Sequence, residues 1–98
     1  MLDSEKNKQI IDYFREYKPV KIGIFGSYAR NENRPDSDLD ILIDLNTAIS
    51  LFQLVRMERE LTELLGVKVD LVTEGAVKNP KLRNYIEADL KIIFQAGK

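Results

Sequence analysis

Residues 20–43 read VKIGIFGSYARNENRPDSDLDILI, in which two short apolar segments flank a polar connection. The first segment, residues 20–25, is rich in β-branched side chains, and the second, residues 38–44, opens with two aspartates and continues as an apolar run. Short apolar runs bounded by turn residues predict strands buried in a sheet. Gly26 ends the first predicted strand, and residues 33–37 have the composition of a turn.

Asp38 and Asp40 stand one residue apart at the start of the second predicted strand. Side chains two positions apart on a strand point to the same face, so we expect both carboxylates to project together. Gly26 allows a ligand to approach the backbone closely, and we expect Ser27 to cap a short helix through about Glu32, whose first amides favour an anion. Paired carboxylates beside an anion seat are what a divalent metal and a nucleoside triphosphate require.

The rest of the chain predicts further helices and strands. Ser50 and Gln53 match a capping box, and Gly66 is the residue expected just after the end of the helix that this box begins. Periodicity and capping predict helices over residues 5–17, 51–65 and 80–88, and strands over residues 67–72 and 90–94. This order predicts an α/β (α+β) fold, a small mixed sheet of three to four strands with helices mostly packed on one face.

The long helix carries an apolar stripe. Its apolar side chains recur at helical spacing, and we expect all of them to be core residues: Leu51, Leu54, Val55, Leu61, Leu64 and Leu65. The charged side chains of the same helix are then expected to face solvent: Arg56, Glu58, Arg59 and Glu60.

A third acid interrupts the strand predicted over residues 67–72. Asp70 lies between Val69 and Leu71, where burying an unpaired carboxylate costs free energy. If this strand neighbours the second one, Asp70 joins Asp38 and Asp40. Three adjacent carboxylates raise each other's pKa, and a divalent cation relieves their repulsion. Ligands that are all oxygen favour Mg²⁺ or Mn²⁺ over zinc.

The composition excludes several classes of chemistry. The 98 residues contain no cysteine and no histidine, which excludes disulfides, thiol nucleophiles, His-based acid–base catalysis and the usual zinc ligands. A net charge of −1 gives no sign of a broad nucleic-acid-binding surface. No apolar stretch approaches the roughly 20 residues of a membrane span, and the polar start is not a signal peptide. We therefore expect one domain, residues 1–98, in the cytoplasm.

The combined motif resembles the DNA polymerase β-type nucleotidyltransferase superfamily. It consists of residues 26–30 (Gly-Ser-Tyr-Ala-Arg), then residues 37–40 (Ser-Asp-Leu-Asp), then Asp70. The length is similar to that of the minimal nucleotidyltransferases, the MNT or MntA-type proteins. The resemblance extends from about Val20 to Val72, and the predicted closing helix and strand also fit. Each part is weak alone, but the combination is specific.

The resemblance implies a role for each motif residue. Asp38 and Asp40 would bind two Mg²⁺ ions, with Mn²⁺ as an alternative, and Asp70 would complete the metal site and accept a proton from the attacking hydroxyl. ATP would be the substrate, bound in part by Gly26 and Ser27, while Arg30 would meet phosphate or a partner. Two such ions clamp the attacking and leaving oxygens of an in-line displacement.

One position departs from the family pattern. The family often has glycine after the Ala-Arg pair, and this chain has Asn31. Asparagine adopts the left-handed backbone conformation more readily than most other residues, so we expect the turn to be kept.

The acceptor is expected to come from another protein. Larger relatives use an extra helical domain to hold the acceptor, and minimal members are commonly paired with a HEPN-family toxin. The resemblance thus implies an antitoxin that transfers AMP from ATP to a tyrosine of a HEPN toxin. Two alternatives stay open. One is a non-catalytic antitoxin that binds nucleotide and occludes its toxin, and the other is transfer to a small molecule such as an aminoglycoside.

Overall fold

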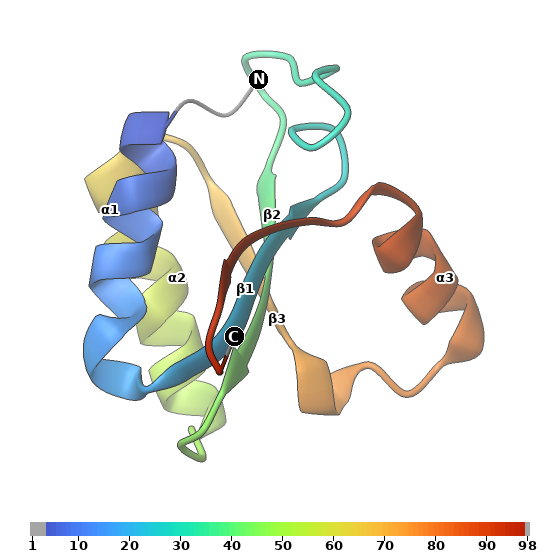
Figure 1. The fold of residues 1–98 in the computed structure, drawn as a ribbon. Helices are drawn as coiled ribbons and strands as arrows, with labels where there is room; N and C mark the ends of the chain where they lie inside the picture. The colour runs from blue at the N-terminus through green and yellow to red at the C-terminus, as the bar shows by residue number, and fades with distance from the viewer. Residues whose placement is uncertain (1–3, 98) are drawn as a thin grey trace.

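A computed structural model describes residues 4–97, which form a four-stranded sheet with helices on both faces (Figure 1). The elements follow in the order α1 (Ser4–Phe14), η1 (Arg15–Tyr17), β1 (Pro19–Phe25), β2 (Leu39–Leu45), α2 (Leu51–Leu65), β3 (Val69–Thr73), η2 (Glu74–Ala76), α3 (Pro80–Asp89) and β4 (Lys91–Gln95). This confirms the predicted fold class. The strand boundaries differ from the predicted ones by one or two residues.

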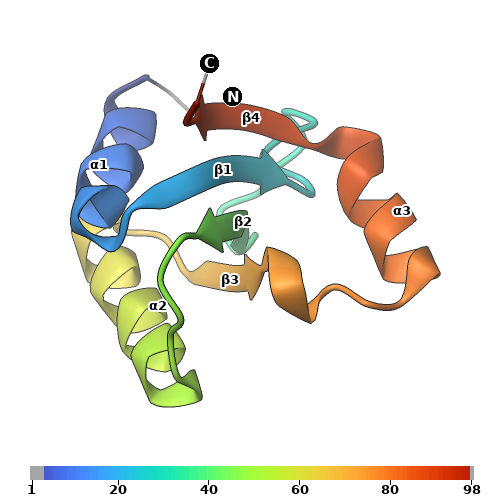
Figure 2. The ribbon, with the colours of Figure 1, turned by 60° about the horizontal axis from the view of Figure 1, so that its bottom comes forward.

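The strand order in the sheet is β3-β2-β1-β4, which Figure 2 shows from its edge. β1 runs antiparallel to both β2 and β4, whereas β2 and β3 are parallel. The sheet is therefore mixed, as predicted, because the long helix α2 provides the crossover that two parallel neighbours need. The parallel pairing of β2 with β3 is the contact on which the prediction for Asp70 depended.

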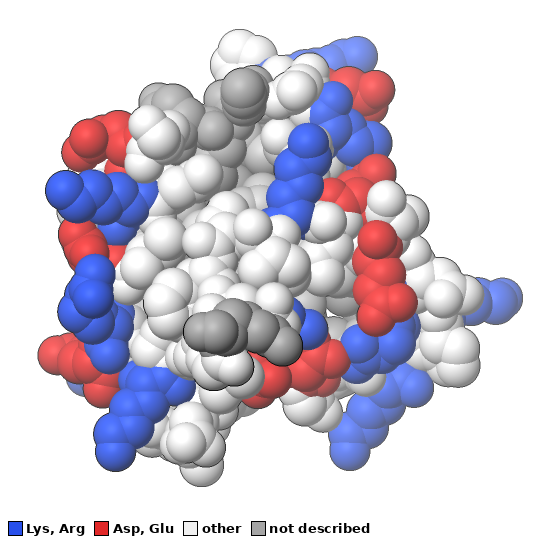
Figure 3. Space-filling view, viewed as in Figure 1, with Lys and Arg blue, Asp and Glu red and all other residues white. Residues whose placement is uncertain are grey.

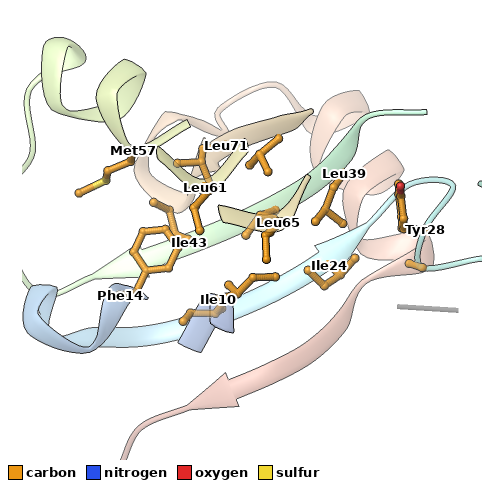
Figure 4. Close-up of a cluster of buried hydrophobic side chains, with 14 residues drawn as sticks. Ile10, Phe14, Ile24, Tyr28, Leu39, Ile43, Met57, Leu61, Leu65 and Leu71 are labelled. Carbon is orange, nitrogen blue, oxygen red and sulfur yellow. The ribbon is translucent and has the colours of Figure 1, made fainter. Parts of the chain in front are cut away.

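The main core lies between the sheet and the helices α1 and α2 (Figure 4). Ile10 and Phe14 of α1 are fully buried, and so are Met57 and Leu61 of α2. They pack on the alternate residues of the strands that point to this face, among them Ile22, Ile24, Leu39, Ile41, Ile43, Val69 and Leu71. A strand places every second side chain on one face, so the intervening residues of β2, including Asp40, belong to the opposite face.

The opposite face carries a smaller core beneath α3. Ile86 of α3 and Val77 before it pack with Phe25 of β1 and Leu42 of β2. Asn79 caps α3 by accepting a hydrogen bond from the Lys81 amide, and proline occupies the first helical turn. The helix thus starts where the sequence predicted it and covers the face that bears the predicted site.

The prediction that the whole apolar stripe of α2 is core was wrong. Met57, Leu61 and Leu65 are buried at a spacing of four residues, but Leu51 and Val55 are 74% and 53% exposed and Leu64 is 47% exposed. The helix contacts the rest of the fold along one narrow line, which is narrower than the stripe that the sequence offers. The capping box of Ser50 and Gln53 and the left-handed Gly66 at the other end are confirmed.

Side chains of α2 also cover the outer edge of β3. Thr62 Oγ1 accepts a hydrogen bond from the Val69 amide (3.0 Å), and Glu58 Oε2 accepts one from the Leu71 amide (2.8 Å). Glu58 was expected to face solvent, but its carboxylate accepts a hydrogen bond from the backbone of β3. The two bonds satisfy edge amides that would otherwise remain open to strand pairing.

Charges of both signs surround the face seen in Figure 3, and uncharged residues cover its middle. This face offers no extended basic area of the kind that binds nucleic acid. Within residues 4–97, none of the helices is long and apolar enough to cross a membrane.

Candidate functional site

The three predicted aspartates lie at the end of the sheet where β1 ends and β2 and β3 begin. Asp40 stands opposite Phe25 of β1 and opposite Asp70 of β3 in the strand register. Asp38 immediately precedes β2, two residues from Asp40. Asp40 is half-buried, whereas Asp38 and Asp70 are exposed. The pairing of two strands far apart in sequence therefore brings Asp70 beside Asp40.

The pKa of the Asp40 carboxyl shows that the three aspartates interact. Burial raises the pKa of the Asp40 carboxyl to about 6, and the negative charges of Asp70 and Asp38 add to this rise. The positive charges of Arg30 and Lys68 act on the same pKa in the opposite direction. Asp40 thus lies at the centre of a group of carboxylates whose negative charges repel one another.

The three aspartates do not converge on one point where a metal ion would sit. Asp38 Oδ2 pairs with Lys68 Nζ at 3.6 Å, and in residues 4–97 no three acidic side chains stand ready to hold a metal ion together. This ion pair is exposed, and such pairs contribute at most about 1 kcal/mol. Breaking this ion pair to free the Asp38 carboxylate for a metal ion would therefore cost little free energy. Hard oxygen donors and mutual repulsion at Asp40 fit a divalent cation such as Mg²⁺.

Gly26 allows the backbone to lie directly against Asp40. Its φ of +77° is in the left-handed region, and a Cβ atom added there would collide with Asp40 Oδ2. Glycine is needed for two independent reasons, the backbone conformation and the absence of a side chain. The turn that follows β1 is consequently held next to the central carboxylate.

The short helix predicted from Ser27 to Glu32 is replaced by a series of turns. The Arg30 amide donates to Gly26 O (3.2 Å), and the Glu32 amide donates to Ser27 O (2.9 Å), which closes the segment after about one turn. Asn31 ends it with a φ of +61°, so the expectation that asparagine keeps the left-handed turn is confirmed. The Arg30 amide is the first in this segment to donate to the segment's own backbone. The Ser27 amide comes before it, where the first amides of a helical turn have no backbone partner within the turn.

Arg30 contacts two carboxylates. Its Nη1 donates to Asp89 Oδ2 at 2.8 Å and its Nε donates to Glu32 Oε1 at 3.0 Å. Asp89 is not among the predicted site residues, and it lies one position beyond the helix predicted over residues 80–88. Only the packing of α3 over the sheet shows that this carboxylate reaches the turn.

Asp40 should make the stability of the metal-free protein depend on pH. Between about pH 4 and pH 6 the unfolded carboxyl has lost a proton that the folded one keeps, so raising the pH favours unfolding. Asp40→Asn removes this contribution. Urea denaturation in the presence of a chelator should therefore show the variant gaining stability over the wild type from pH 4 to pH 6, with no further gain above it. A constant difference across this range would contradict the assignment.

A sequence profile described as the nucleotidyltransferase domain matches residues 7–93. The chain belongs to this family. It is therefore a nucleotidyltransferase, an enzyme that uses a nucleotide as a substrate. The match includes β1, the turn with Gly26 and Ser27, and all three aspartates. The sequence-based recognition of a nucleotidyltransferase is confirmed.

Related proteins support the same family. The chain is 48% identical over 85 residues to "Putative protein adenylyltransferase MJ1217" of Methanocaldococcus jannaschii, a match that covers 87% of this chain and 85% of the relative. Two solved structures share the fold. One is a toxin-antitoxin with AMP-PNP (TM-score 0.82, 23% identity, 92% of this chain and 73% of that one). The other is a tri-AMPylated Shewanella oneidensis HEPN toxin in complex with MNT antitoxin (TM-score 0.78, 21% identity, 97% and 74%).

Proposed function

We propose that this nucleotidyltransferase moves AMP from ATP to a tyrosine hydroxyl of a HEPN-family toxin and so acts as its antitoxin. The observation that carries the proposal is the position of Asp40, which lies between Asp70 and the backbone of Gly26 and close to Asp38. The relative in M. jannaschii is named for protein adenylylation, and a structural neighbour is bound to an AMPylated HEPN toxin. These names motivate the choice of nucleotide and acceptor.

Each residue of the site has a proposed part in the reaction. Asp38, Asp40 and Asp70 would hold Mg²⁺, which when bound supplies positive charge for the triphosphate and for the attacking oxygen. The open Ser27 amide and hydroxyl, next to Gly26, bind phosphate oxygens.

The transfer itself forms one bond and breaks another. The tyrosine oxygen attacks the α-phosphorus, a new P–O bond forms, the bond to the bridging oxygen breaks and pyrophosphate leaves. Asp70, which is exposed at the sheet edge, accepts the proton of the tyrosine. This position is open to solvent and therefore accessible to a side chain that another protein inserts.

The test is incubation with ATP, Mg²⁺ and a HEPN-family toxin as the acceptor. ATP labelled at the α-phosphate should label the partner, and ATP labelled at the γ-phosphate should not, because the γ-phosphate leaves with pyrophosphate. Substituting the modified tyrosine of the partner by phenylalanine should abolish the label. Label from the γ-phosphate, or no label although the protein binds AMP-PNP, would contradict the proposal.

A further inference from the structure

Arg30 is held in one orientation by groups from two parts of the chain. Asp89 at the end of α3 binds Nη1, and Glu32 in the same turn binds Nε. Hydrogen bonds to Asp89 and Glu32, with a smaller contribution from Tyr85, raise the pKa of the guanidinium above its ordinary value. The guanidinium carries five N–H donors, and neither carboxylate takes a hydrogen from Nη2. Neither carboxylate therefore occupies Nη2, which can still donate to another anion.

The helix that supplies Asp89 is firmly attached to the sheet. Ile86 is only 2% exposed, and the Tyr85 ring packs edge-on against Phe25 with 6.4 Å between ring centroids. Arg83 Nη1 pairs with Glu74 Oε2 at 2.8 Å, and Lys21 of β1 pairs with the other oxygen of Glu74 at 3.2 Å. These contacts join α3 to η2 and to the central strand. Asp89 is consequently presented from a fixed support.

Two residues of α3 face the turn of residues 26–31 together. Tyr85 and Asp89 are four positions apart, which places them on the same side of a helix. Hydrogen bonds with both of them raise the pKa of Arg30. The positive charge of Arg30 in turn acts to lower the pKa of Asp40. The guanidinium is thus a positive charge within electrostatic range of the central carboxylate, and its direction is set by α3.

We infer that Asp89 is a positioning residue for the nucleotide. It holds Arg30 so that the free edge of the guanidinium meets the triphosphate beside Asp40, and it does this without touching the nucleotide itself. Holding a long side chain in its binding orientation reduces the entropy that binding would otherwise lose. This inference rests on the proposed function only in assuming that the site binds a nucleoside triphosphate.

The experiment measures the Kd of AMP-PNP with Mg²⁺ by calorimetry. Asp89→Asn should weaken binding about 10-fold, which is the effect of losing one hydrogen bond to a charged group. Arg30→Ala should weaken it at least as much, and the double variant should match Arg30→Ala alone. Asp89→Glu keeps the charge and should restore most of the loss. In the transfer assay, Asp89→Asn should raise the KM for ATP and leave kcat nearly unchanged.

Glu87→Gln is the matched control. Glu87 lies on the same helix and pairs with Arg83 at 3.3 Å rather than with Arg30, so its variant should bind AMP-PNP within about twofold of the wild type. An unchanged or tighter Kd in Asp89→Asn would overturn the inference, and so would a loss that persists in the Arg30→Ala background. If the wild type binds AMP-PNP but transfers no AMP, the proposed function fails and the Kd series still decides on Asp89. If the wild type does not bind AMP-PNP, both are overturned.

Discussion

Combining Asp38→Asn with Asp40→Asn is expected to lower AMP transfer at least about 1,000-fold, a loss of about 4 kcal/mol of transition-state stabilisation. Each substitution removes the negative charge of a carboxylate that would hold Mg²⁺. Asparagine preserves the size of each side chain. Transfer of the α-phosphate label to the HEPN partner provides the measurement. The fold should survive, because the Asp40 carboxylate is partly buried and is repelled by Asp38 and Asp70. Replacing it by a neutral amide removes the free-energy cost of burying that charge.

Asp44→Asn serves as the control for this pair. Asp44 lies on the same strand but toward its other end, opposite Lys21, and should be replaceable without loss of transfer. Transfer by the double variant within about 10-fold of the wild type would contradict the catalytic assignment. Full protection of cells by a variant that no longer transfers AMP would instead favour the non-catalytic antitoxin, which acts by occluding its toxin.

Gly26→Ala is expected to destabilise the protein by about 2–3 kcal/mol and to weaken AMP-PNP binding. The new methyl group meets Asp40 Oδ2, so the carboxylate or the turn has to move, and the backbone at φ +77° disfavours any side chain. Urea denaturation measures the first effect and calorimetry the second. Because either movement shifts the Asp40 carboxylate relative to the turn, the loss of binding should accompany the loss of stability.

Gly66→Ala separates the two causes. Gly66 has nearly the same φ, +76°, but nothing lies within 4 Å of an added Cβ, so this variant should lose only about 1 kcal/mol. Adding Asp40→Ala to Gly26→Ala removes the collision and should recover the difference between the two glycine variants. Equal losses in Gly26→Ala and Gly66→Ala would show that the contact with Asp40 is not tight.

Local sequence patterns were sufficient for most of the fold. The apolar runs around Ile22 and Ile41 became the central strands, and the capping box at Ser50 and the glycine at position 66 delimit α2. These signals act over a few residues and do not depend on what packs nearby. The pair Asp38 and Asp40 could also be placed in advance, because the two-residue period of a strand is a local property.

Other features depend on which elements meet. The stripe of α2 appeared to be entirely core, yet Leu51 and Val55 are exposed, since the width of the contact is set by how the helix lies on the sheet. Glu58 looked like a solvent-facing acid until the edge of β3 came within reach of it. The segment after Gly26 is a series of turns because Asn31 and the Glu32 amide close it after about one turn.

The chemistry of the site divides in the same way. Residue types and short spacings alone pointed to two carboxylates on one strand, a glycine turn before them and hard oxygen donors as the available ligands. The meeting of Asp70 with Asp40, the contact of Gly26 with Asp40 Oδ2 and the hold of Asp89 on Arg30 came only with the packed chain. Asp70 and Asp89 lie 30 and 59 positions along the chain from their partners. Strand pairing and helix packing bring such distant groups together, and both are set by the burial of the whole core rather than by neighbouring residues.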